Sequence, residues 1–198
     1  MAAYSVGAGR QPAARPGAGP APITQAQRDQ GAKEGPAAIA AAKAACTMSE
    51  AMFIASGTNP QKQKINFYEV SCKEGLGYII EQSPTGATAY NCITIAGQAA
   101  TEIAAGKQPS LNCRLSGNAD PKSGLAPFIT ATGRACTVTN ARAMGATAAG
   151  ESYYEAACEG GTGYVIKTAA PGSTAAAEVM NCIEYLGTAS ACSLTTKD

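Results

Sequence analysis

A thirteen-residue segment occurs twice in this chain, and this repeat constrains the fold more than any other feature. Residues 68–80 read Tyr-Glu-Val-Ser-Cys-Lys-Glu-Gly-Leu-Gly-Tyr-Ile-Ile, and residues 154–166 read Tyr-Glu-Ala-Ala-Cys-Glu-Gly-Gly-Thr-Gly-Tyr-Val-Ile. Seven of the thirteen positions are identical, at a separation of 86 residues. Self-similarity at a long separation indicates a duplicated structural unit. We therefore expect a tandem pair of modules.

The cysteines divide evenly between the two copies. They are Cys46, Cys72, Cys92 and Cys113 in the first copy, and Cys136, Cys158, Cys182 and Cys192 in the second. Leu, Ile, Val and Phe together number only 26 of 198 residues, so a module of about 80 residues has a small core. We expect disulfides to compensate, which predicts an oxidising compartment, either the periplasm or the extracellular medium. Because the chain has no histidine and no C-x-x-C, we predict no metal site and no other cofactor.

Four cysteines in a module allow three disulfide pairings, and hairpin geometry favours one of them. If Cys46 and Cys72 face each other on antiparallel strands, the chain must turn near residue 59, at Asn59-Pro60. Cys136 and Cys158 require a turn near residue 147, one or two residues before the turn signal Ala149-Gly150. The Cα atoms of facing residues on such strands lie about 4.5–5.5 Å apart, which suits a disulfide. The remaining pairs are Cys92 with Cys113 and Cys182 with Cys192.

The pattern of elements predicts an α+β fold. We expect an extended Ala/Gly/Pro-rich arm over residues 1–35, module 1 over 36–117 and module 2 over 118–198. Each module is predicted to contain a short helix and an antiparallel sheet of three or four strands. The helices are expected at 36–45 and within 121–133, and the strands at 46–54, 65–72, 136–144 and 152–158, with third strands opening at Tyr78 and Tyr164. Short fourth strands are expected at 113–116 and 192–195, and residues 93–106 are expected to be helical, with 183–191 as a shorter equivalent.

The N-terminal arm cannot build a core of its own. Its Pro, Gly and Ala favour extended conformations, so it is either a spacer or an arm that orders along a partner surface. It lacks the apolar stretch of a signal sequence. The net charge of +1 argues against a nucleic-acid partner, and no apolar run is long enough for a transmembrane segment.

Two pairs of repeated side chains are candidate binding residues. Glu69 and Glu155 each follow a tyrosine on a strand whose neighbouring residues face inward, so we expect these carboxylates to point to solvent or toward a lysine. Tyr78 and Tyr164 follow a Gly-x-Gly turn, where glycines supply positive φ, and we expect both rings to pack on the sheet. A paired tyrosine surface for a sugar or protein is the alternative. No catalytic residue is predicted, because no histidine can activate a nucleophile.

The second copy resembles a group of small, disulfide-rich secreted proteins of Gram-negative bacteria. The resemblance rests on Cys-Thr-Val-Thr-Asn-Ala-Arg at 136–142, the segment 153–165 with its Tyr-Glu-x-x-Cys and Gly-x-Gly-Tyr motifs, and Asn-Cys at 181–182. Members carry this unit singly or in tandem, and the resemblance extends over residues 45–198. Copy one departs at Met48, Glu50 and Met52. The resemblance implies an envelope setting and implies no activity.

These observations favour a non-catalytic structural or assembly subunit of the cell envelope or of an extracellular assembly. Its N-terminal arm, residues 1–35, would contact a protein partner or another subunit. The alternative is a soluble periplasmic or secreted binding or inhibitor module that presents the two tyrosine-bearing sheets. An enzyme is not expected.

We predict that the fold depends on oxidation. A closed loop of about 25 residues should contribute roughly 3–4 kcal/mol in the chain-entropy description. The reduced and alkylated protein should therefore lose its cooperative thermal transition in circular dichroism. A transition retained in full would contradict this prediction.

Overall fold

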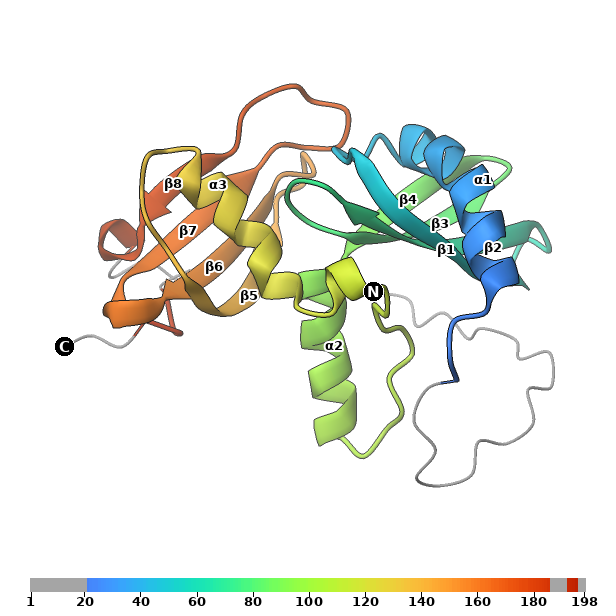
Figure 1. Cartoon of the computed structure of the whole chain (residues 1–198), viewed down its shortest axis with the longest axis horizontal. Helices are drawn as coiled ribbons and strands as arrows, with labels where there is room; N and C mark the ends of the chain where they lie inside the picture. The colour runs from blue at the N-terminus through green and yellow to red at the C-terminus, as the bar shows by residue number, and fades with distance from the viewer. Residues whose placement is uncertain (1–20, 186–191, 196–198) are drawn as a thin grey trace.

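Two four-stranded antiparallel sheets lie side by side in a computed structural model of the chain (Figure 1). The structure describes residues 21–185 and 192–195. Both sheets are simple meanders in which each strand pairs with the next along the chain. The predicted α+β class and the tandem pair of modules are confirmed.

Module 1 consists of two helices and one sheet. Its elements are α1 (Gln25–Ala42), β1 (Met48–Thr58), β2 (Lys64–Cys72), β3 (Tyr78–Ser83), β4 (Gly86–Asn91) and α2 (Cys92–Ala104). The short 3-10 helix η1 (Ser116–Asn118) follows a loop and packs back on β2. The helix predicted at 93–106 is thus present as α2, which projects from the body between the modules (Figure 1).

Module 2 repeats the sheet with shorter helices. Its elements are η2 (Pro121–Leu125), α3 (Ala126–Thr130), β5 (Val138–Ala146), β6 (Ser152–Cys158), η3 (Glu159–Gly161), β7 (Gly163–Thr168), β8 (Glu178–Asn181) and η4 (Cys182–Tyr185). The predicted fourth strands at 113–116 and 192–195 are wrong, because β4 and β8 hold that place in the sheets. The remainder of the helical segment predicted at 183–191 lies outside the described residues after Tyr185.

Helix α1 begins earlier than the sequence predicts. Residues 25–35, expected in the extended arm, are helical, and Pro36 lies inside the helix rather than at its start. Thr24 and Gln27 form a capping box that supplies acceptors to the first turn. This start signal, together with packing on the sheet, outweighs the loss of one backbone donor at Pro36. The first 20 residues of the predicted arm lie outside the described residues.

Small residues allow α1 to lie close to the sheet. Its buried face carries Gly31, Gly35, Ala38, Ile39 and Ala42. A Cβ on Gly31 would overlap the backbone of β1. A Cβ on Gly35 would lie 3.0 Å from the Cβ of Ala51 in β1. The alanine-rich composition therefore serves a close helix–sheet contact.

All four predicted disulfides are present. The hairpin disulfides are Cys46–Cys72 and Cys136–Cys158, and the inner disulfides are Cys92–Cys113 and Cys182–Cys192. The hairpin pairs do not face each other directly, since Met48 and Val138 stand opposite the second cysteines. The first strand of each hairpin, β1 or β5, has two register irregularities at equivalent places. Each irregularity adds one residue to that strand relative to its partner. The turns, 59–63 and 147–151, therefore begin at the predicted midpoints, residues 59 and 147, and extend beyond them.

One hydrophobic cluster joins the two modules. Leu76 and Ile93 of module 1 pack in the same cluster as Leu125, Ile129 and other residues of module 2. This cluster covers the face of the second sheet that corresponds to the face covered by α1 in the first. The modules therefore form one packed body.

The repeated tyrosine of each second strand fixes the element that covers its sheet. The hydroxyl of Tyr68 donates to Glu34 of α1 at 2.6 Å. Its equivalent, Tyr154, accepts a hydrogen bond of 2.8 Å from the amide of Asn91 in module 1. Module 1 thus contributes to the cover of the second sheet, as α1 covers the first sheet.

None of the helices in the described ranges is both long and apolar enough to cross a membrane.

We predict opposite effects for alanine at two helical glycines. Gly31→Ala should lower the free energy of unfolding by about 1–3 kcal/mol, because the added methyl group overlaps β1. Gly97→Ala in α2 is the matched control, since nothing lies within 4 Å of its Cβ position, and it should raise stability by up to about 1 kcal/mol. Urea unfolding of the oxidised proteins measures both. Equal effects would contradict the close packing of α1.

Candidate functional site

Glu69 and Glu155 are fully buried, which contradicts the prediction that they point to solvent. Both side chains have 0% exposure. The prediction assumed that one face of each sheet is open. In module 1, the face of the sheet that points away from α1 is also covered. Helix α2 and the loop after it cover it through a cluster that contains Phe67, Ile79 and Ile95. The carboxylate of Glu69 therefore lies between sheet and loop.

The carboxylate of Glu69 accepts backbone hydrogen bonds from the loop. The N–H of Arg114 donates to both carboxylate oxygens, at 2.7 and 2.8 Å, and the N–H of Leu115 donates at 2.8 Å. The side-chain amide of Asn118 donates at 2.9 Å and also bonds the carbonyl of Val70 at 3.1 Å. All partners are donors, as a carboxylate requires.

Glu155 has the same arrangement in module 2. The N–H groups of Ser193 and Leu194 donate to one oxygen at 2.8 and 2.6 Å. The guanidinium of Arg142 donates to the other at 2.6 Å and forms an ion pair with it. In both modules, therefore, the carboxylate binds the two N–H groups directly after the last cysteine.

This arrangement explains why the predicted fourth strands do not form. The N–H groups at 114–115 and 193–194 would have bonded a neighbouring strand, but they bond a carboxylate instead. The residues that complete each cluster, Asn118 and Arg142, carry no pattern that marks them in the sequence. Asn118 was assigned to module 2, but its side chain lies in module 1.

The third partner of each carboxylate differs, and so does the pKa. Burial raises the pKa of Glu69, and the hydrogen bonds from Asn118, Leu115 and Arg114 offset only part of this effect. Burial also raises the pKa of Glu155, but the N–H groups of Ser193 and Leu194 and the charge of Arg142 outweigh it and hold the pKa below 4.5. Met52 faces Glu69 at the position where Arg142 faces Glu155. The Arg is thus a feature of module 2 only.

Each carboxylate also lies beside an inner disulfide. An oxygen of Glu69 and the sulfurs of Cys92 and Cys113 lie within 4.8 Å of one another, and the equivalent atoms in module 2 do the same. These atom types can ligate metals, but each sulfur is bonded to its partner and each carboxylate accepts hydrogen bonds. The groups are occupied in building the fold.

Tyr164 is buried and Tyr78 is half-buried, and both rings pack in or against the hydrophobic clusters on the sheets, as predicted. Tyr164 is 7% exposed, and Arg134 lies over its ring at 5.4 Å. Tyr78 packs against the cores of both modules, and burial raises its pKa to about 12. The alternative of a paired tyrosine surface is wrong, because neither ring forms an open face.

The repeated glycines have two different roles. Gly75 and Gly161 have φ values of 83° and 84°, so the predicted positive φ holds for the first glycine of each Gly-x-Gly. The second glycines, Gly77 and Gly163, are needed for space: a Cβ would overlap the side chain of Asn118 or Thr195. The second glycine thus admits the segment that each carboxylate holds.

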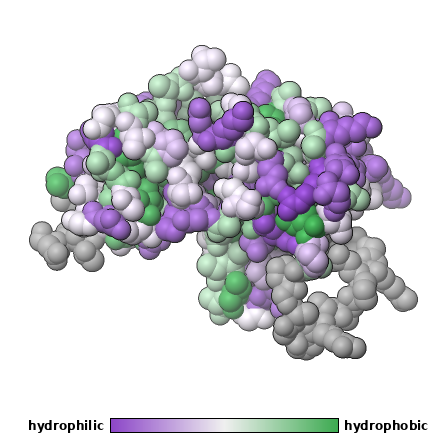
Figure 2. All heavy atoms as spheres, viewed as in Figure 1, coloured by the Kyte–Doolittle hydropathy of each residue, from purple (hydrophilic) through white to green (hydrophobic). Residues whose placement is uncertain are grey.

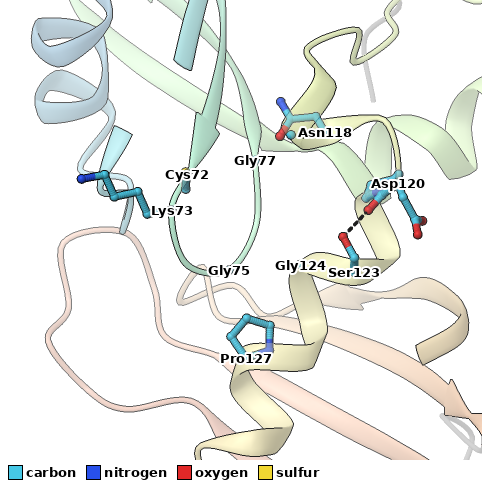
Figure 3. Close-up of a pocket in the computed structure, with 11 residues that line it drawn as sticks. Cys72, Lys73, Gly75, Gly77, Asn118, Asp120, Ser123, Gly124 and Pro127 are labelled. Atoms are coloured by element: carbon cyan, nitrogen blue, oxygen red, sulfur yellow. Dashed lines mark hydrogen bonds between the residues drawn. The ribbon is translucent and has the colours of Figure 1, made fainter. Parts of the chain in front are cut away.

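One small polar cavity lies beside the first of these turns (Figure 3). Its volume is about 190 Å³, and its walls are the loop after β2 and the segment from η1 to α3. Lys73 directs its side chain away from the cavity, while Asn118 and Ser123 line the opposite wall (Figure 3). Sites for drug-sized ligands usually exceed about 300 Å³, so this cavity suits a few waters or a very small polar molecule.

Comparison with known proteins gives no matching family model, no matching curated protein and no matching solved structure. The four disulfides fit a protein of an oxidising, non-cytoplasmic compartment.

We predict that glutamine is tolerated less well at 155 than at 69. Glu155→Gln places a donor against Arg142 or against two N–H groups, and should cost roughly 2–3 kcal/mol at pH 7. Glu69→Gln should cost less, because one amide oxygen can accept three of the four hydrogen bonds that Glu69 receives. Urea unfolding at pH 7 compares the two variants, and equal losses would contradict the assignment.

The deficit at position 155 should depend on pH. The folded pKa of Glu155 is lowered, so its contribution to stability is present above its unfolded pKa near 4.5 and is lost as the pH falls through the folded value. The difference between wild type and Glu155→Gln should therefore shrink on acidification. For Glu69 the sign is opposite: a raised folded pKa makes its contribution larger at low pH and smaller as the pH rises through it.

Proposed function

We propose that this protein is a non-catalytic structural or assembly subunit of the bacterial cell envelope or of an extracellular assembly. One observation carries the proposal: the side chains that the two copies share are used to build the fold. The repeated cysteine is in a disulfide, the repeated glutamate binds backbone N–H groups, and the repeated tyrosines and isoleucine are packed in or against the cores. The duplication therefore repeats a rigid scaffold.

The surface of the body favours the N-terminal segment as the contact. Exposed large hydrophobic side chains in the described ranges are Tyr90, Ile103 and Ile183, on three separate elements. On the face drawn in Figure 2, hydrophilic side chains gather over module 1 and apolar ones form small groups. Stable interfaces bury about 800 Å² on each partner, which small groups of this kind do not supply.

The Pro-rich segment before α1 can supply such an area by lying along a partner. Its attachment is defined, since the carbonyl of Ala21 accepts a hydrogen bond from the guanidinium of Arg114 and α1 is packed on β1. The segment therefore leaves the body from a fixed point. We assign the partner contact to residues 1–20, a shorter arm than the 1–35 that the sequence suggests.

The alternative function is a soluble periplasmic or secreted binding or inhibitor module. The cavity beside Gly75 and Asn118 is the observation that favours it, because its walls are polar. In this alternative the ligand is a very small polar molecule, and residues 1–20 are a spacer.

We predict that deletion of residues 1–20 abolishes assembly and leaves the body folded. The truncation must stop there, because removal of residues 1–34 would take away the first half of α1 with Gly31. Size-exclusion chromatography with light scattering should show a defined oligomer for the oxidised full chain and a monomer for the truncated chain, with unchanged thermal unfolding.

A full chain with residues 1–20 shuffled is the matched control, since it keeps length and composition. It should behave as the truncated chain if the sequence of the arm is recognised. A monomeric full chain would contradict the assembly proposal and favour the binding module.

A further inference from the structure

In each module the inner disulfide has a carboxylate within reach of both of its sulfurs. The inner disulfides Cys92–Cys113 and Cys182–Cys192 have Glu69 and Glu155 within 4.8 Å of both sulfurs. Among the residues that the structure describes, no carboxylate oxygen lies within that distance of both sulfurs of a hairpin disulfide. The chain thus carries its own comparison twice.

Burial alone does not distinguish the two kinds of disulfide in module 2. In Cys182–Cys192 one cysteine is 5% exposed and the other is half-buried. In Cys136–Cys158 one cysteine is 6% exposed and the other is again half-buried. Their Cα atoms are 5.8 and 5.2 Å apart. The carboxylate is therefore the difference to consider.

We propose that Glu69 and Glu155 protect the inner disulfides against reduction by thiols. Reduction begins when a thiolate attacks one sulfur, here the half-buried Cys113 or Cys192, and forms a mixed disulfide with it. The original S–S bond breaks, and the buried Cys92 or Cys182 leaves as a thiolate. A second thiol then releases the outer cysteine, so two thiols are oxidised to one disulfide while the protein gains two electrons and two protons.

The negative charge of this reaction develops next to a buried carboxylate. The attacking thiolate brings one negative charge, which the transition state spreads over three sulfurs, and the two cysteine sulfurs among them lie within 4.8 Å of the carboxylate. Repulsion at this distance in a protein interior should slow the attack on the order of ten- to a hundred-fold. In module 2 the Arg142 guanidinium, which is paired with Glu155, offsets part of this repulsion, so the lower end of the range is expected there. The carboxylate also holds the outer cysteine's loop in place through the N–H groups at 114–115 and 193–194.

The two contributions can be separated with thiols of different charge. A loosened loop would speed reduction by every thiol equally, whereas loss of a negative charge speeds anionic reagents most. This inference goes beyond the proposed function and does not rest on it, because it concerns the chemistry of the disulfides and needs no partner.

The experiment measures the reduction rate of each disulfide in the oxidised full chain at pH 8. The reductants are 2-mercaptoethanesulfonate (anionic), 2-mercaptoethanol (neutral) and cysteamine (cationic), and alkylation with mass spectrometry identifies the reduced pair. The rate for Cys182–Cys192 is divided by the rate for Cys136–Cys158 in the same molecule, which removes the intrinsic reactivity of each thiol. In the wild type this ratio should rise from the anionic to the cationic reagent.

Glu155→Gln should raise the ratio about tenfold or more with the anionic thiol and less with the cationic thiol. Glu69→Gln should do the same for Cys92–Cys113 relative to Cys46–Cys72. Should either variant fail to fold, the wild-type series still decides the matter. A wild-type ratio that is the same for all three thiols would overturn the proposal, as would a variant whose ratio rises equally for all of them.

Discussion

A buried carboxylate that accepts backbone N–H groups is the interaction on which each module depends. The loop after the last cysteine of a module lies against the sheet without being a strand, so its N–H groups have no neighbouring strand to bond. Leaving them unpaired in the interior would cost about 1–3 kcal/mol each. Glu69 and Glu155 supply the acceptor at this point. The inner disulfide fixes the covalent end of the same loop, and the second glycine of each Gly-x-Gly leaves room for it.

The duplicated anchor explains how a chain with few large apolar residues forms one body. The face of each sheet that carries the repeated tyrosine also needs a cover. The part of the chain that precedes the sheet supplies this cover. Helix α1 covers the first sheet, while Leu76 and Ile93 of module 1 join η2 and α3 over the second. The equivalent tyrosines, Tyr68 and Tyr154, each bond that preceding element. The result is a pair of modules that pack against each other through one hydrophobic cluster.

Much of the fold could be predicted from residue types and spacing. The cysteine spacing favours the observed pairing, because turn residues lie at or near the midpoints of Cys46–Cys72 and Cys136–Cys158. Strands β2 and β6 follow from their aromatic residues, and α2 follows from Ile93, Ile95 and the alanines. The start of α1 was missed because Pro36 reads as a first helical residue, whereas the capping box at Thr24 and Gln27 decides the start.

The site could not be predicted, because it depends on a long-range contact. Alternation along β2 and β6 places Glu69 and Glu155 on the face of the sheet away from Tyr68 and Tyr154. It carries no information on what covers that face. Asn118 and Arg142 reach the carboxylates only after the chain has folded back. One signal was available: glutamate is the only charged residue among the seven identical positions of the repeat. A charge kept in both copies, three residues before a cysteine, indicates a defined partner in the fold.

Backbone amide hydrogen exchange of Arg114, Leu115, Ser193 and Leu194 tests the central claim most directly. These residues lie in loops, where amides ordinarily exchange fast, but their N–H groups are bonded to buried carboxylates. The account predicts that they exchange as slowly as the amides of β2 and β6. Exchange at the rate of exposed loop amides would contradict it, because the carboxylates would then not hold the loops.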